Sequence, residues 1–107
     1  MQQRNDKNLG LSRIEHLILE ILAENGELFG LELVGKSNGD LKRGTVYVTL
    51  ARMEEKGLLR SKQQPRMAPE IGIPRRIYSI TGYGERILKA WQASRLLFTQ
   101  LAEVVTS

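Results

Sequence analysis

The 107-residue chain contains no cysteine, which excludes disulfides, a thiolate nucleophile and cysteine-ligated zinc. It has a single histidine, His16, and therefore no second histidine to complete a metal site or an acid–base pair. We expect His16 to make a packing or partner contact. No apolar run exceeds three residues, which excludes a membrane-spanning helix, and the polar residues 1–10 do not form a signal peptide. The sequence predicts a cytoplasmic protein that holds no metal ion or cofactor.

The overall composition is that of one small soluble domain. Hydrophobic residues make up 41% and charged residues 26%, which allows a modest core and little room for a second domain. A core of this size often depends on a partner subunit. The net charge of +4 is unevenly spread, because residues 36–76 hold ten Lys or Arg against four Asp or Glu. This local excess predicts a surface that binds a polyanion.

The N-terminal half of the chain has the pattern of three short helices. Ser12 and Glu15 make a capping box that starts the first helix, which ends at about residue 25. A second helix is expected from about Gly30 to Ser37, and Asn38-Gly39-Asp40 ends it. The third helix is expected over residues 42–56. Two helices joined by a short turn predict a helix-turn-helix unit.

The third helix has one apolar face and one face with few bulky groups. Val46, Leu50 and Met53 share a side at 3.6 residues per turn. The opposite side is small or hydrogen-bonding, and Lys56 and Arg60 are among the cations around it. Such a helix fits the major groove of DNA, which is about 12 Å wide. The alternative is an ordinary amphipathic helix whose charges are solvated.

The C-terminal half predicts two strands and a long helix. Residues 58–62 and 75–80 have strand character, and the proline-containing loop between them completes a wing. Residues 27–30 are too few for more than a bridging strand or turn. Thr81 caps a last helix of roughly 24 residues, or about 35 Å, which is longer than a small winged domain can cover. Its surplus apolar seam predicts a dimer, and the alternative is that the seam covers only its own core.

One segment matches the pattern of a nucleotide-binding enzyme. Residues 30–37, GLELVGKS, fit the phosphate-loop pattern G-x-x-x-x-G-K-[ST]. Such a loop needs a buried strand before it and a helix after it whose N-terminus faces the phosphates. Residues 27–29 are too short for that strand, and residues 38–40 interrupt the chain where the helix should begin. No other catalytic constellation is present, so we expect no enzyme activity.

Three segments together carry a family resemblance. Residues 44–59 begin Gly-Thr-Val-Tyr and end Leu-Ala-Arg-Met-Glu-Glu-Lys-Gly-Leu-Leu. Residues 74–84 read Pro-Arg-Arg-Ile-Tyr-Ser-Ile-Thr-Gly-Tyr-Gly, and Phe29-Gly30 precede Leu33. In order and spacing these segments resemble the PadR family of winged-helix transcriptional regulators over about residues 11–84. The sequence departs from the family where Val48-Thr49 stand in place of a common proline.

The resemblance implies a mainly α fold with a small antiparallel β wing. It divides the chain into an arm at 1–10, a winged helix-turn-helix domain at 11–80 and a dimerisation helix at 81–107. It also implies a homodimeric regulator, usually a repressor, that binds an inverted-repeat operator in double-stranded DNA. The third helix would lie in the major groove, with wing residues 60–76 on the minor groove or the phosphates. The alternative is a winged helix that binds proteins and does not contact DNA.

The expected DNA-binding residues lie on the third helix, just before it and on the wing. They are Lys42, Arg43, Thr45, Tyr47, Val48, Thr49, Arg52, Arg66, Arg75 and Arg76. Tyr47 is expected either to contact a phosphate or to place its hydroxyl at the core edge. Because side chains alternate along a strand, either Arg75 or Arg76 is expected to turn inward or sideways, where it can pair with a helix carboxylate.

The expected dimer seam runs along the last helix. Its members are Ile87, Trp91, Phe98, Leu101 and Val105. Trp91 has two interpretations: a tryptophan in the dimer core, or, as in some relatives, one wall of a pocket between subunits for a flat aromatic effector.

Overall fold

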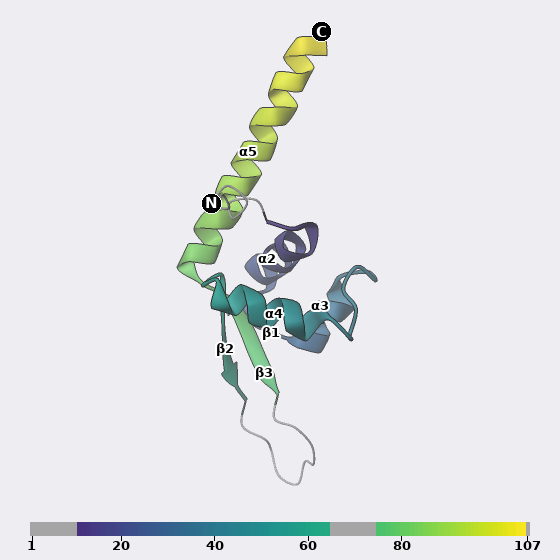
Figure 1. Ribbon diagram of the computed structural model, residues 1–107, viewed down its shortest axis with the longest axis vertical. Helices are drawn as coiled ribbons and strands as arrows, with labels where there is room; N and C mark the ends of the chain where they lie inside the picture. Colours follow the sequence, from purple (N-terminus) through teal and green to yellow (C-terminus); the bar gives the residue numbers. More distant parts are fainter. Residues whose placement is uncertain (1–10, 65–74, 107) are drawn as a thin grey trace, which may run out of the picture.

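The computed structural model describes residues 11–64 and 75–106, with side chains as far as residue 103. The elements follow one another as predicted, helices before the wing and one long helix after it (Figure 1). They are α2 (Arg13–Asn25), β1 (Leu28–Phe29), α3 (Gly30–Lys36), α4 (Val46–Glu55), β2 (Leu59–Gln63), β3 (Arg76–Ile80) and α5 (Gly82–Thr106). The predicted fold class is confirmed. Residues 1–10, Arg66 and the side chain of Val105 lie outside the described part of the chain.

The start of α2 is the capping box that the sequence predicts. The Ser12 hydroxyl oxygen accepts a hydrogen bond from the backbone N–H of Glu15, at 3.1 Å. The Ser12 N–H in turn donates to the Glu15 carboxylate, also at 3.1 Å. The helix ends at Gly26, whose φ of 86° is accessible to glycine at little cost.

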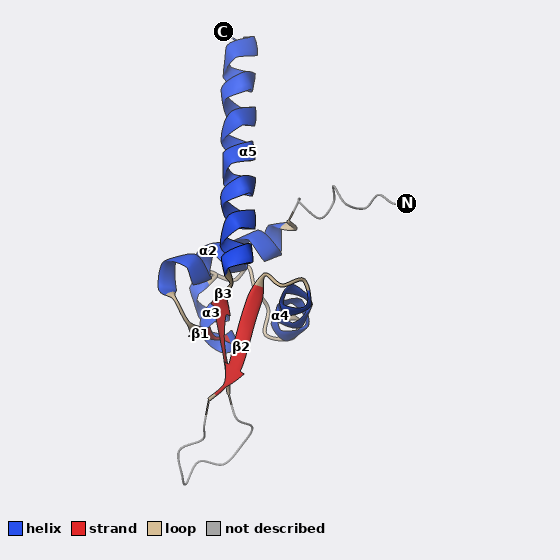
Figure 2. Cartoon of the chain, turned by 90° about the vertical axis from the view of Figure 1, so that its left-hand side faces the viewer, coloured by secondary structure: helices blue, strands red, loops and turns tan. Residues whose placement is uncertain are grey.

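A three-stranded antiparallel sheet forms the wing and joins it to the helices (Figure 2). The strand order is β1-β3-β2, with Leu28 opposite Tyr78 and Leu59 opposite Ile80. The segment expected to be a bridging strand or turn is the two-residue β1, which runs directly into α3. The wing is therefore attached to the helix-turn-helix unit through the middle strand of the sheet.

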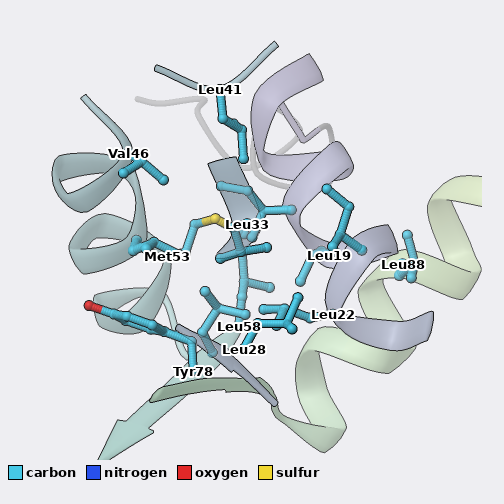
Figure 3. Close-up of a cluster of buried hydrophobic side chains, with 14 of the residues drawn as sticks. Leu19, Leu22, Leu28, Leu33, Leu41, Val46, Met53, Leu58, Tyr78 and Leu88 are labelled. Atoms are coloured by element: carbon cyan, nitrogen blue, oxygen red, sulfur yellow. The ribbon is translucent and has the colours of Figure 1, made fainter. Parts of the chain in front are cut away.

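The core lies between α2, α3, α4 and the inner face of the sheet (Figure 3). The predicted face of α4 is buried, since Val46, Leu50 and Met53 are each at most 1% exposed. The other large side chains that are fully buried are Ile18, Leu19, Leu22, Leu33 and Leu59. Each buried aliphatic side chain contributes roughly 1.5–3 kcal/mol, so this cluster fixes α4 on the body of the domain.

The base of α5 is fixed by a network around Thr81. The Thr81 hydroxyl donates to the Gly57 carbonyl at 2.6 Å and accepts from the Gly84 N–H at 2.9 Å, so Thr81 caps α5. Gly84 packs so tightly that a Cβ there would lie 2.2 Å from the Leu58 carbonyl oxygen. From this base α5 crosses α2 and extends far beyond the rest of the domain, as Figures 1 and 2 show.

The third helix is shorter than predicted. We expected residues 42–56, but α4 starts at Val46, and residues 43–45 form a turn. Gly44 is a poor helix former, and Thr45 has a φ of −123°, outside the helical range. Lys42 and Arg43 therefore precede the helix by most of a turn and do not lie in its first turn.

Candidate nucleic-acid interface

The exposed face of α4 is the one predicted to approach another surface. Thr45, Ala51, Arg52 and Glu55 are exposed, and Thr49 is half-buried. Val48 is 59% exposed, although its isopropyl group is apolar. The face offers small groups, one aliphatic patch and one guanidinium, with the Glu55 carboxylate at its C-terminal end, and the part from Thr45 to Arg52 suits contact with base edges in a groove.

Tyr47 lies at the flank of this face and packs against the start of α3. Its side chain covers Gly30, where a Cβ would be 2.5 Å from Tyr47 Cε1 and 2.8 Å from the hydroxyl oxygen. The ring is nevertheless 47% exposed. The structure thus places Tyr47 at the core edge with its ring also open to solvent.

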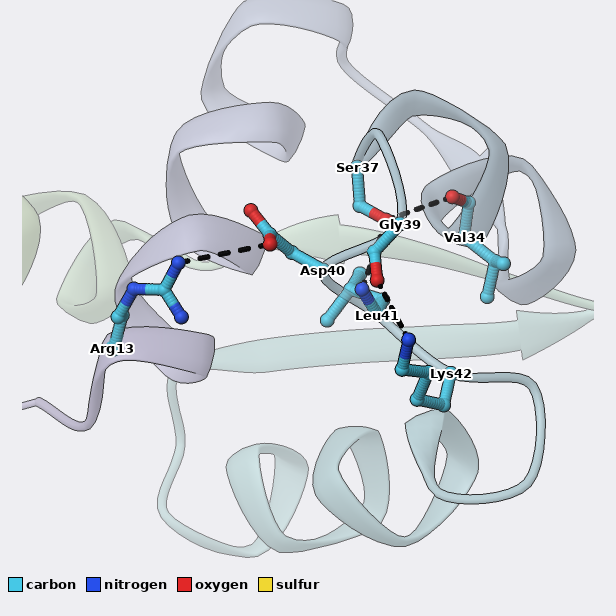
Figure 4. A network of polar contacts seen from close by, with 7 residues as sticks. All are labelled: Arg13, Val34, Ser37, Gly39, Asp40, Leu41 and Lys42. Carbon is cyan, nitrogen blue, oxygen red and sulfur yellow. Dashed lines mark hydrogen bonds and ion pairs between the residues drawn. The ribbon is translucent and has the colours of Figure 1, made fainter.

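The turn before α4 is held by its own hydrogen bonds (Figure 4). The Ser37 hydroxyl donates to the Val34 carbonyl at 2.8 Å and accepts from the Leu41 N–H at 2.9 Å. Asn38 and Gly39 both have positive φ, at 55° and 89°, and this reverses the chain within a few residues. The turn is therefore a fixed platform for the cations that follow it.

Three cations lie at this end of the domain. Lys42 is exposed and its ammonium donates to the Gly39 carbonyl at 3.0 Å. Arg43 is exposed in the turn itself. Arg13, the first residue of α2, was not singled out from the sequence. Its guanidinium lies 3.6 Å from the Asp40 carboxylate, and its side chain remains 78% exposed (Figure 4). No local spacing indicates Arg13, because the ion pair joins residues far apart in the sequence.

The two wing arginines point in different directions. The Arg75 guanidinium lies 5.1 Å from the centre of the Phe29 ring, a cation–π contact. Arg76 donates to the Ser61 hydroxyl at 3.1 Å, and that hydroxyl donates to the Glu54 carboxylate of α4 at 2.9 Å. Arg76 therefore turns sideways, as expected of one of the two, but it contacts Ser61 and makes no direct ion pair with the Glu54 carboxylate.

Lys56, counted among the cations around α4, is paired inside the domain. Its ammonium lies 2.6 Å from the Glu15 carboxylate, whose side chain is only 7% exposed. Burial alone would raise the pKa of Glu15, but the Lys56 ammonium and the Ser12 N–H outweigh it, so this pKa is lowered. In the described part of the chain, Arg43, Arg52 and Arg60 make no such ion pair and remain available to an external anion.

A family comparison decides what kind of protein carries this surface. The model of the PadR-like transcriptional regulator family matches residues 18–90, which include the helices, the wing and the base of α5. The chain belongs to the PadR-like family of transcriptional regulators. This is a family of regulators and not of enzymes. No functionally curated protein matches the sequence at a significant level.

Several solved structures of bacterial proteins are similar to this PadR-like regulator. It is 25% identical to a PadR family transcription regulator from Clostridium difficile R20291, over 90% of this chain and 100% of that one, with a TM-score of 0.71. A PadR-like transcriptional regulator from Bacillus cereus is also 25% identical, over 88% and 92% of the two chains, with a TM-score of 0.66. Bacillus subtilis PadR, solved in complex with operator DNA, shares the fold at 18% identity and a TM-score of 0.67, over 78% of this chain and 48% of that one.

The phosphate-loop pattern does not form such a loop in this PadR-like regulator. Residues 30–36 are the helix α3, and the Ser37 hydroxyl is used inside the following turn. Within the described ranges, no three His, Cys, Asp or Glu side chains come together in a possible metal site. None of the described helices is long and apolar enough to cross a membrane.

Along α5 the predicted seam residues fall into two groups. Ile87 and Trp91 are half-buried and pack against the chain's own core. The Trp91 ring stacks on His16 with centroids 3.8 Å apart, so His16 makes a packing contact, as expected. Phe98 and Leu101, further along the helix, are 72% and 54% exposed. The first half of α5 completes the domain, and the second half leaves apolar side chains in solvent.

Proposed function

We propose that this PadR-like regulator binds double-stranded DNA as a homodimer at an inverted repeat and represses transcription there. In each subunit α4, the recognition helix, enters the major groove, and the wing lies on the minor groove or the phosphates. The observation that carries the proposal is the exposed face of α4, where Val48 and Arg52 stand among the smaller side chains of Thr45, Thr49 and Ala51. A regulator of this kind acts in the cytoplasm, on the chromosome.

The recognition helix would read bases through a small number of side chains. Arg52 can donate to guanine O6 and N7, and Val48 can contact a thymine methyl group. Thr45 and Thr49 lie on the α2 side of the same face, where their hydroxyls or methyls reach neighbouring bases. Tyr47 borders the groove with its exposed edge.

The cations around the helix would fix its position on the backbone. Arg43, Lys42 and Arg13 lie at the N-terminal end of α4, where the helix dipole also favours a phosphate. Arg75, and Arg66 as assigned to the wing from the sequence, would reach phosphates of the adjacent minor groove.

Dimerisation is proposed from the second half of α5. Leu97, Phe98 and Leu101 are each more than half exposed, and no other part of the described chain covers them. A second copy packing α5 against α5 would bury them, with Ile87, Trp91 and Val105 extending the seam. We therefore divide the chain into an arm at 1–10, a DNA-binding domain at 11–80 and a dimerisation helix at 81–107.

A flat aromatic effector is a further, smaller part of the proposal. Beside Trp91 lies an open groove of about 280 Å³, lined also by His16, Glu20 and Arg95. The Arg95 guanidinium already lies 4.9 Å from the centre of the Trp91 ring. An aromatic ligand would have to displace Arg95 in order to stack there.

Fluorescence anisotropy tests DNA binding directly. The full chain would be titrated onto the DNA upstream of its own gene and onto a random duplex, at several salt concentrations. We expect tighter binding to the upstream DNA. For each phosphate contacted, the logarithm of the association constant should fall by about 0.9 when the salt concentration rises tenfold. The absence of binding at low salt would refute the proposal and favour a protein-binding winged helix.

The variant Arg52→Ala then tests the role of the recognition helix. Loss of a base contact would cost about 1–3 kcal/mol on the preferred site and much less on random DNA. An equal loss on both duplexes would assign Arg52 to phosphate contact instead.

A further inference from the structure

A chain of three side chains connects the recognition helix to the wing. The Arg76 guanidinium donates to the Ser61 hydroxyl at 3.1 Å, and this hydroxyl donates to the Glu54 carboxylate at 2.9 Å. The three residues come from β3, β2 and α4 respectively. We call Glu54, Ser61 and Arg76 the wing brace.

The register of the sheet explains why these groups meet. Ser61 lies opposite Tyr78, and Arg76 is two residues from Tyr78 on the same strand. Side chains two residues apart share a face of a sheet, so Ser61 and Arg76 lie on the face that carries Tyr78. Tyr78 is buried, and burial and the nearby Glu54 carboxylate raise its pKa. The brace therefore lies on the face of the sheet that is turned to α4.

The brace lies where the wing is least supported by the core. At one end of the strand pair, Leu59 is buried. At the other end, Lys62, Gln63 and Arg76 are exposed. Among the described residues, the Ser61–Glu54 bond is the only side-chain hydrogen bond that joins α4 to either of these strands. The other contacts of the outer wing run to the segment around β1, through the Lys62–Glu27 ion pair at 3.7 Å and the Arg75–Phe29 contact, and none of these reaches α4.

We propose that the wing brace fixes the angle between the wing and the recognition helix, so that both reach DNA without further ordering. Glu54, Ser61 and Arg76 are positioning residues in this role. A carboxylate near a DNA surface repels phosphates, so Glu54 favours binding only through what it holds in place. Rigid placement before binding lowers the entropy lost on association. The inference rests on the proposed DNA binding.

The sign of one substitution distinguishes the brace from simple electrostatics. Glu54→Ala removes a negative charge, and electrostatics alone predicts tighter binding to a random duplex. The brace predicts that Glu54→Ala binds the same duplex about fivefold more weakly than the parent, which corresponds to the free energy of roughly one hydrogen bond. The matched control is Glu24→Ala in α2, because Glu24 is exposed beside α5, outside the proposed DNA-binding face, and makes no hydrogen bond or ion pair within the described residues. The control is expected to bind at least as tightly as the parent.

Ser61 offers a test with no change of charge. Ser61→Ala should weaken binding by about the same factor, and Ser61→Thr, which keeps the hydroxyl, should restore it. The double variant Glu54→Ala/Ser61→Ala should bind about as well as either single variant, since both break one brace. Tighter binding by Glu54→Ala, or equal binding by Ser61→Ala and Ser61→Thr, would overturn the inference.

Hydrogen exchange tests the brace without DNA. Backbone amides of residues 61–64 and 75–77 should exchange faster in Ser61→Ala than in Ser61→Thr, while amides of α2 keep their protection. Unchanged exchange in the wing would refute the brace whatever the DNA results. If the parent protein does not bind DNA but exchange changes as expected, the brace stands and the proposed function fails.

Discussion

Gly84 lies at the point where α5 leaves the sheet, and the substitution Gly84→Ala tests how tightly this junction is packed. An added Cβ would lie 2.2 Å from the Leu58 carbonyl oxygen and 2.9 Å from Ile80 Cγ1. The first of these contacts is with backbone, so it cannot be relieved by rotating a side chain. Either α5 or the segment after α4 must move. Overpacking of well-packed sites costs about 1–3 kcal/mol, and we expect the upper end here, about 3 kcal/mol.

The size of this effect is measurable against a matched variant. For a domain of this size, 3 kcal/mol corresponds to a fall in Tm of about 12–24 °C. The control is Gly35→Ala in α3, where no described atom lies within 4 Å of the added Cβ. Alanine there should stabilise the protein by up to about 1 kcal/mol through helix propensity. The assay is thermal and urea unfolding followed by circular dichroism at one protein concentration. If Gly84→Ala and Gly35→Ala unfold alike, the steric argument is wrong.

Other predictions concern an ion pair, a packed ring and the dimer. Lys56→Met should lower the free energy of unfolding by about 1 kcal/mol at neutral pH, because Lys56 is 44% exposed and solvent screens its pair with Glu15. The folded-state pKa of Glu15 is lowered from 4.5, so this stabilisation is present above pH 4.5 and is lost as the pH falls through the folded-state pKa. The free energies of unfolding of the parent and the variant should therefore converge in acid. A difference that stays constant with pH would contradict the assignment. Gly30→Ala should turn the Tyr47 ring outward, seen as shifted ring resonances in NMR with little loss of stability; unshifted resonances would show that the backbone moves instead. Phe98→Glu should give monomers in sedimentation equilibrium with unchanged helical content, and a dimer persisting at micromolar concentration would remove this half of α5 from the interface.

Local patterns were enough to predict the elements of this fold. The capping box of Ser12 and Glu15, and the buried face made by Val46, Leu50 and Met53, depend on neighbours within a few residues along the chain. The start of α4 was predicted too early, because the apolar periodicity does not report the backbone angles of the turn before it. Those angles are set by the hydrogen bonds of the turn.

Contacts between distant parts of the chain were harder to predict. Lys56 looked like one of several cations around the helix, but it pairs with Glu15, which is 41 residues away in the sequence. Nothing in the residues around either partner indicates this pairing. For Arg76, strand alternation predicted that one wing arginine would turn aside, yet only the register of β2 and β3 identifies Ser61 as its neighbour. Trp91 was expected in the dimer seam, and its stacking on His16 shows that it packs against the core of its own chain.

In the proposed dimer, the network around Thr81 would also limit how much change in the spacing of the two DNA half-sites the protein can tolerate. It joins α5, the proposed dimer axis, to the end of α4, so the two recognition helices of a dimer keep a fixed separation only if this joint does not bend. The chain as a whole extends 33 Å along its second-longest axis, and this sets the scale of the lever arm. A rotation of about 5° at the joint would move its far side by about 3 Å, close to the 3.4 Å rise of one base pair. A stiff joint would therefore make the regulator sensitive to the insertion of a single base pair between half-sites.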